Sequence, residues 1–108
     1  MVKKITQGNK QTTVTILNKK ELKAQGLNLH LAVNQGSPKE PKLIIIEYTG
    51  GKSKDPFTAL VGKGITFDTG GLNLKPTGSI ETMRGDMSGA AAVIGVLRNT
   101  LALNIKKM

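Results

Sequence analysis

Four ionisable side chains with a distinctive spacing lie in the most glycine-rich part of the sequence. Lys63, Asp68, Lys75 and Asp86 follow the pattern Lys-x4-Asp-x6-Lys-x10-Asp. Aspartates can supply the hard oxygen ligands that divalent cations prefer. Charged side chains on a loop beside a rigid strand and helix are also typical of active sites. A metal-dependent site is therefore one hypothesis for this segment.

Each of these residues also has an ordinary structural explanation. Asp68 precedes the turn-forming run Thr69–Gly71, where an aspartate commonly bonds to its own backbone. Asp86 comes just before a periodic helical segment, where an aspartate is a common N-cap. Lys63 and Lys75 could be solvated surface lysines. Spacing alone favours these ordinary roles over a metal site.

The metal hypothesis makes a geometric demand on the segment between Lys63 and Asp68. Residues five apart on a straight strand face opposite sides of it. For both side chains to reach one metal, the strand must end or bend near Gly64, which a glycine permits. A straight backbone from Leu60 to Asp68 would contradict the hypothesis.

Other familiar motifs are incomplete in this sequence. Gly51–Ser53 reads Gly-Lys-Ser, but a phosphate-binding loop would need a glycine at the position of Ile46. A dinucleotide-binding Gly-x-Gly-x-x-Gly would need its third glycine where Phe67 stands. His30 is the only histidine and is distant in sequence from the glycine-rich segment. We interpret it as a core or partly exposed histidine.

The chain is strongly basic, with 16 Lys+Arg against 7 Asp+Glu and a formal charge of +9. A basic nucleic-acid-binding module is therefore an alternative. The lysines are dispersed, however, and they are not interleaved with stacking aromatics, so we interpret them as solvated faces. Apolar runs are too short for a membrane span, and the N-terminus lacks the apolar core of a signal peptide. We expect neither nucleic acid nor a membrane as partner.

Periodicity and turn signals predict an α/β chain. Residues 1–11 are expected to be a disordered lead-in. Apolar and β-branched runs predict strands at 12–17, 42–49 and 57–61, while capping and 3- to 4-residue periodicity predict helices at 19–25 and 87–101. Residues 27–34 alternate as in a strand but also suit a helix, and we favour a helical turn there. The second and third strands are continuously apolar, which predicts burial on both faces in a parallel sheet. With so few covering helices, the fold is expected to be incomplete.

Three segments resemble the leucyl (cytosol) aminopeptidase family of metallopeptidases. They are Val61–Gly71 (VGKGITFDTGG), Leu74–Pro76 (LKP) and Glu81–Val93 (ETMRGDMSGAAAV), and the resemblance continues upstream through residues 19–50. It implies a partial three-layer α/β/α catalytic domain with a mostly parallel central sheet. Residues 12–108 would form the N-terminal part of that domain, which is truncated here.

The resemblance also implies residue roles. Lys63, Asp68 and Asp86 match ligands of two divalent metal ions, Mn²⁺ or Zn²⁺ with Mg²⁺ as a further candidate. Lys75 matches the catalytic lysine that binds the scissile carbonyl oxygen. Met83 matches a residue lining the pocket for the first substrate side chain, and Asp86 also faces substrate. A lysine ligates metal only as the neutral amine, which burial would favour.

The implied activity is removal of N-terminal, preferably apolar, residues from peptides by a two-metal hydroxide mechanism. The implied setting is a cytoplasmic homohexamer. The family's later Asn-Thr-Asp-Ala-Glu-Gly-Arg segment, which carries further ligands, does not occur in these 108 residues. We therefore expect a fragment with no useful peptidase activity and weak metal binding. A non-catalytic structural fragment is the remaining alternative.

Overall fold

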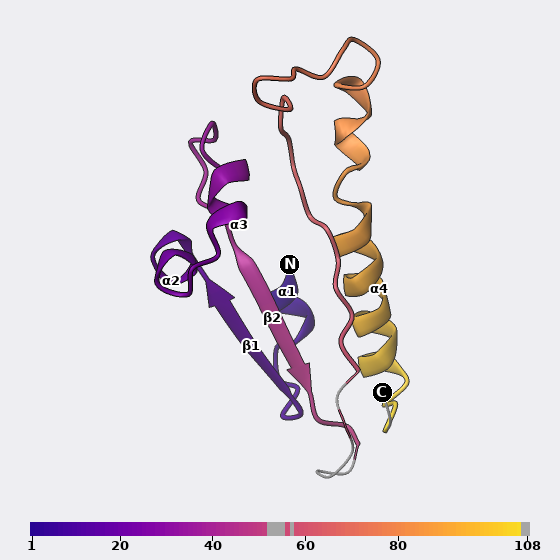
Figure 1. Ribbon diagram of the computed structural model, residues 1–108. Coiled ribbons are helices and arrows are strands. Elements are labelled where there is room, and N and C mark those ends of the chain that lie inside the picture. Colours follow the sequence, from indigo (N-terminus) through magenta and orange to yellow (C-terminus); the bar gives the residue numbers. More distant parts are fainter. Residues whose placement is uncertain (52–55, 57, 107–108) are drawn as a thin grey trace. The chain divides into compact units, whose positions relative to one another are not determined.

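The computed structural model describes residues 1–51, 56 and 58–106, which form two compact units (Figure 1). One unit comprises Thr6–Tyr48, and the other combines Met1–Ile5 with Thr49–Met108. Each unit has its own secondary structure. The functional candidates Lys63, Asp68, Lys75 and Asp86 all belong to the second unit.

The unit Thr6–Tyr48 is built on a two-stranded antiparallel sheet. Strand β1 spans Thr12–Leu17 and strand β2 spans Leu43–Tyr48, as their apolar and β-branched runs predict. Their register pairs Leu17 with Leu43 at one end and Thr12 with Tyr48 at the other. Because side chains alternate along a strand, one face gathers Val14, Ile16, Ile44 and Ile46.

Two short helices connect the strands. Helix α2 spans Lys19–Ala24 and begins with a capping box, in which the Asn18 side chain accepts from Lys20 N at 3.0 Å and Glu21 Oε2 accepts from Asn18 N at 3.0 Å. Helix α3 spans Asn28–Val33. Both helices confirm the sequence-based prediction. Reciprocal capping satisfies backbone donors that a short helix would otherwise leave without partners.

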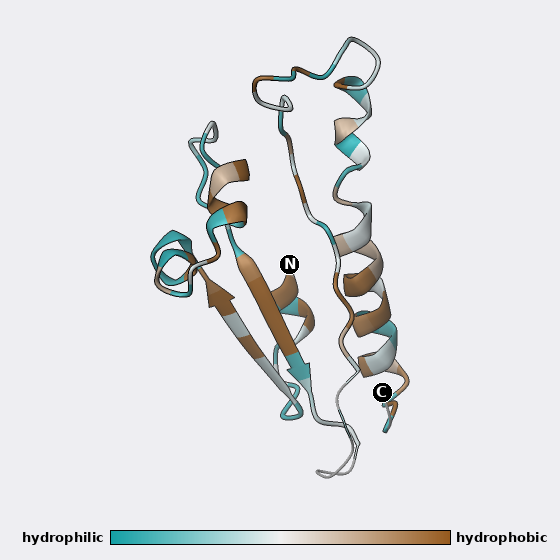
Figure 2. Ribbon diagram, viewed as in Figure 1, coloured by the Kyte–Doolittle hydropathy of each residue, from teal (hydrophilic) through white to brown (hydrophobic). Residues whose placement is uncertain are grey.

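The sheet corrects two expectations while the α/β class is confirmed. The two described strands are antiparallel. The connection through α2 and α3 leaves β1 at Leu17 and enters β2 at Leu43, which pairs with Leu17 at the same end of the sheet. A continuous apolar run reports burial and does not determine strand direction. Figure 2 shows β2 as apolar over most of its length, yet Ile44 and Ile45 are 44% and 41% exposed. The predicted burial on both faces is therefore absent in this chain.

The second unit contains α1 (Val2–Ile5), the 3₁₀ helix η1 (Glu81–Gly85) and α4 (Ser88–Ala102). Helix α4 confirms the predicted periodic helix, with Leu97 and Thr100 buried. Helix α1 lies within residues 1–11, for which the sequence predicted a disordered lead-in. The Met1 carbonyl accepts from the backbone N–H groups of Lys4 and Ile5, and Val2 is buried.

The strand predicted over residues 57–61 is also wrong where it can be compared. Phe57 lies outside the described residues, and residues 58–61 carry no strand. Val61 is 94% exposed, so the segment is not buried on both faces either. A strand is defined by hydrogen bonds to a neighbouring strand. The backbone of the following residues instead meets helix α4.

Helix length bears on whether these elements could cross a membrane. A spanning helix needs about 20 predominantly apolar residues. Helix α4, at 15 residues, is shorter than that, and none of the described helices is long and apolar enough to cross a membrane.

The side chain of Leu22 in α2 is completely buried, so its substitution tests whether it forms the core of the unit Thr6–Tyr48. We expect Leu22→Ala to lower the free energy of unfolding by about 2–5 kcal/mol, the usual range for a buried leucine. Urea denaturation followed by circular dichroism measures the change. Leu29→Ala in α3 is the matched control, since Leu29 is 86% exposed. Equal effects of the two substitutions would contradict this assignment of the core.

Candidate functional site

The backbone at Lys63 lies directly against the first turn of α4. The Ala90 N–H donates a hydrogen bond of 2.8 Å to the Lys63 carbonyl. A Cβ atom on Gly62 would lie 2.6 Å from the Gly89 carbonyl oxygen, and one on Gly89 would lie 2.9 Å from the Lys63 backbone nitrogen. These distances are too short for any side chain. Two glycines therefore permit the approach that brings Lys63 to the helix.

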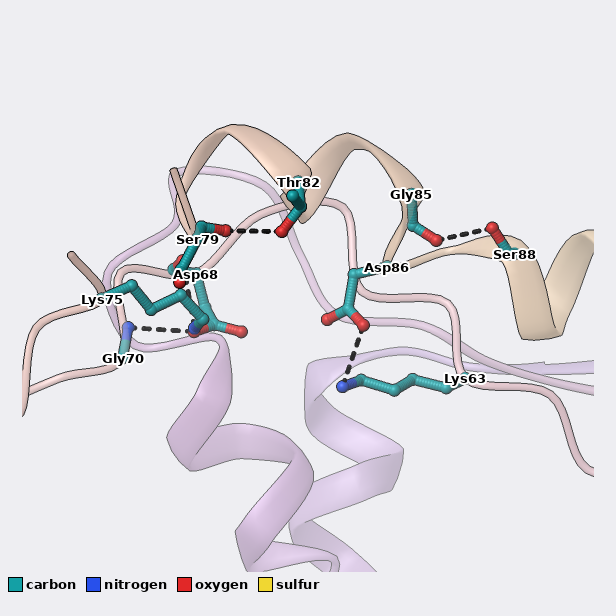
Figure 3. Close-up of polar contacts among 9 residues, drawn as sticks. All are labelled: Lys63, Asp68, Gly70, Lys75, Ser79, Thr82, Gly85, Asp86 and Ser88. Carbon is teal, nitrogen blue, oxygen red and sulfur yellow. Dashed lines mark hydrogen bonds and ion pairs between the residues drawn. The ribbon is translucent and has the colours of Figure 1, made fainter. Parts of the chain in front are cut away.

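This approach places Lys63 beside Asp86. The Lys63 Nζ lies 3.1 Å from Asp86 Oδ1 (Figure 3). Asp86 ends η1, donating its own N–H to the Met83 carbonyl at 3.0 Å. The predicted N-cap role of Asp86 is wrong, because α4 begins after Met87 and has no side-chain cap bond. The Asp86 carboxylate therefore does not cap α4 and instead pairs with Lys63.

Asp68 and Lys75 are held by a compact loop. The Asp68 Oδ1 accepts from the Gly70 N–H at 2.9 Å, which is the turn role predicted for this aspartate. The Thr69 carbonyl accepts from the Lys75 N–H at 2.9 Å and closes the loop. Gly70 has a φ of +95°, and a Cβ there would lie 2.6 Å from the Asn73 carbonyl oxygen. Only glycine fits this position.

The loop brings the Lys75 ammonium onto the Asp68 carboxylate. Lys75 Nζ donates to Asp68 Oδ1 and also lies 3.4 Å from the Asp68 carbonyl oxygen (Figure 3). Both side chains are 27% exposed, so this pair is more sheltered than Lys63, which is 64% exposed. The site therefore contains two lysine–aspartate pairs.

The pKa of the Asp68 carboxyl is held below its ordinary value. The largest cause is the hydrogen bond from Lys75, and the charge of Lys75, the Gly70 N–H and the charge of Lys63 add to it, while burial acts in the opposite direction. A lowered folded-state pKa means that the stabilisation is present above the ordinary pKa and is lost as pH falls through the folded value. The charge of Lys63 is the smallest of these causes.

Lys63, Asp68, Lys75 and Asp86 gather at the loop and the turn before α4, with the two carboxylates directed into the space between these segments (Figure 3). Met83 lies in η1 and is only 5% exposed. Lys63 is more exposed than a neutral amine ligand was expected to be.

As a donor set for metal ions, the site is partial. Asp68 and Asp86 offer carboxylate oxygens, and Lys63 would offer a nitrogen as the neutral amine. Zinc takes about four ligands, and oxygen-seeking cations about six. Across the part of the chain that is described, no three histidine, cysteine or acidic side chains gather in one place. The donor chemistry suits divalent cations, but it falls short of a complete coordination shell.

Similarity to known proteins extends over the whole of this chain. The model of the cytosol aminopeptidase family, catalytic domain, matches residues 1–108. The chain belongs to the cytosol aminopeptidase family. The match includes residues 1–11, so the segment expected to be a lead-in lies within the family's catalytic-domain match.

Curated relatives agree with this membership. A probable cytosol aminopeptidase of Protochlamydia amoebophila is 47% identical over 102 residues, covering 94% of this chain and 20% of the relative. One of Pseudomonas fluorescens strain Pf0-1 is 48% identical over 96 residues, covering 89% and 19%. One of Brucella anthropi is 49% identical over 85 residues, covering 79% and 17%. This family member therefore spans about a fifth of the length of these relatives.

Sequence reasoning missed the two residues that position the site. It treated Gly62 as part of a glycine-rich loop and assigned no role to Gly89. The small residues Ala90–Ala92 and Gly95 did indicate that α4 lies close to a neighbouring segment. They did not indicate that its neighbour is the backbone beside Lys63, because that contact joins segments that are 26 residues apart at Lys63 and Gly89.

Gly62→Ala tests this close approach. The added methyl would collide with the backbone of Gly89 and Ala90, and we expect a loss of about 1–3 kcal/mol in the free energy of unfolding, as for other overpacked sites. Gly95→Ala is the matched control within α4, because nothing lies within 4 Å of its Cβ position. It should stabilise the helix by about 0.5–1 kcal/mol. Thermal or urea denaturation measures both, and the same sign of change in both would contradict the proposed contact.

Proposed function

We propose that this chain is the metal-carrying segment of a leucyl aminopeptidase catalytic domain. The whole protein would remove N-terminal, preferably apolar, residues from peptides. The observation that supports this most is the gathering of Lys63, Asp68, Lys75 and Asp86 at one loop and one turn, in a chain that belongs to the cytosol aminopeptidase family. Two divalent ions, Mn²⁺ or Zn²⁺ with Mg²⁺ as a further candidate, would complete the site.

Each side chain has a proposed task. Asp68 and Asp86 would hold metal through carboxylate oxygens, and Lys63 through its neutral amine. When bound, divalent ions supply Lewis-acid polarisation of the scissile carbonyl and activation of water. Lys75 would remain an ammonium, because its task is electrostatic: it would donate a hydrogen bond to the carbonyl oxygen as negative charge develops there. Met83 would form an apolar wall for the first substrate side chain.

The remaining features of the proposal concern the whole protein. The apolar strands β1 and β2 would become part of a three-layer α/β/α domain, which would cover the exposed faces of Ile44 and Ile45. We propose a cytoplasmic homohexamer as the working assembly. The 108-residue chain alone would have no useful peptidase activity, since its donor set lacks a full coordination shell.

The first test is metal binding by the chain. We expect weak Mn²⁺ binding, measured by the electron paramagnetic resonance signal of free Mn²⁺. Asp68→Asn and Asp86→Asn should each weaken it by about tenfold or more, the usual loss on removing a charged ligand or its close support. Glu47→Gln is the control, since Glu47 lies on β2 in the other compact unit and belongs to neither lysine–aspartate pair. Unchanged binding in both aspartate variants would favour a non-catalytic structural fragment.

The second test is hydrolysis in a complete protein. The matching 102-residue segment of the Protochlamydia amoebophila relative can be replaced by this chain and the chimera assayed with leucine-p-nitroanilide and Mn²⁺. We expect activity, and we expect Lys75→Ala to lower kcat by about a hundredfold or more, as for loss of an oxyanion donor. Arg98→Ala on the exposed side of α4 is the control. A chimera that folds and hydrolyses equally well with the Lys75→Ala substitution would contradict the catalytic role of this lysine.

A further inference from the structure

We propose, on the basis of the proposed function, that Asp68 holds Lys75 as an internal counter-ion and that a divalent cation binding at Oδ1 of this carboxylate displaces the ammonium. The displacement frees Lys75 for the substrate. The catalytic lysine would thus be sequestered in the metal-free chain and would become available only as the metal site fills. The ion pair between Asp68 and Lys75 would thus couple metal binding by Asp68 to substrate binding by Lys75.

The contacts of Asp68 support the exchange. Its Oδ1 accepts from both Lys75 Nζ and the Gly70 N–H, so the lone pairs of this oxygen are already used. Lys75 Nζ also lies 3.4 Å from the Asp68 carbonyl oxygen. A cation that approaches Oδ1 therefore meets a positive charge at the same atom. Since like charges repel at such range, the ammonium and the cation cannot share this oxygen without a cost.

The loop allows the exchange by side-chain movement alone. The backbone of Lys75 is fixed by its N–H bond to the Thr69 carbonyl, and Gly70 packs against Asn73 and Lys75. The lysine side chain, in contrast, has a flexible four-carbon stem and is 27% exposed. It can leave Asp68 toward solvent while its Cα stays in place. The freed ammonium remains tethered beside the site, where a peptide carbonyl would bind.

The two lysines of the site should therefore affect metal binding with opposite signs. Lys63 is a proposed ligand, so its removal should weaken binding. Lys75 is a competitor for Asp68, so its removal should strengthen binding. Neither a general charge effect nor a purely structural role predicts opposite signs, because each lysine pairs with one aspartate of the same site.

The experiment compares Mn²⁺ affinities of the 108-residue chain and its variants by the free-Mn²⁺ resonance signal. Lys75→Met removes the charge and keeps the length, and we expect binding to tighten by about two- to fivefold, the scale of a partly exposed ion pair. Lys75→Arg keeps the charge and should bind no tighter than the unaltered chain. Arg84→Met is the charge control, since Arg84 is exposed and does not contribute to the lowered pKa of Asp68. Lys63→Met should bind more weakly.

The outcomes separate this inference from the proposed function. Tightening in Lys75→Met that exceeds any change in Arg84→Met supports the exchange. Binding that is equal or weaker in Lys75→Met, with Mn²⁺ still bound in a manner that depends on Asp68, overturns the exchange and leaves the metal site standing. Absence of Mn²⁺ binding in every variant, Lys75→Met included, overturns both. A circular dichroism spectrum of each variant checks that the loop substitutions leave α4 folded.

Discussion

The site depends on one close contact between backbones. The segment at Gly62 and Lys63 meets the first turn of α4 without any intervening side chain, and the Ala90 N–H bonds to the Lys63 carbonyl. Glycine at positions 62 and 89 is the condition for that contact. Because Asp86 lies two residues before the first residue of α4, the same contact sets the separation between Lys63 and Asp86. Backbone packing, rather than side-chain attraction, thus positions the ion pair.

Charge is balanced locally within a strongly basic chain. The formal charge is +9, yet the site pairs each of its two aspartates with one lysine. The pairs differ in character. Asp68 and Lys75 are sheltered to the same degree and belong to one closed loop, whereas Lys63 reaches Asp86 from a separate segment and stays mostly exposed. A sheltered pair resists screening by salt more than an exposed one does, so the loop pair is the firmer of the two.

Local signals in the sequence predicted most individual elements. Asn18 predicted the start of α2, the β-branched run predicted β1, and the spacing of Ala90, Ile94 and Leu97 predicted α4. These succeed because caps, turns and periodicity act within a few residues. The spacing of the four charged residues raised a metal site as one hypothesis, and the resemblance of residues 61–71, 74–76 and 81–93 to a known family indicated the roles of these residues.

Tertiary structure decided the direction of β2, the absence of a strand at residues 58–61, and the partner of each charged residue. Each depends on a contact between distant segments, which local patterns do not encode. Its position in the sequence predicted that Asp86 is an ordinary helix cap, whereas in the folded chain its carboxylate pairs with Lys63. The pairing of Lys63 with Asp86 required the approach of Gly62 to Gly89. That approach is a contact between two backbones, so no pattern of side chains in the sequence predicts it.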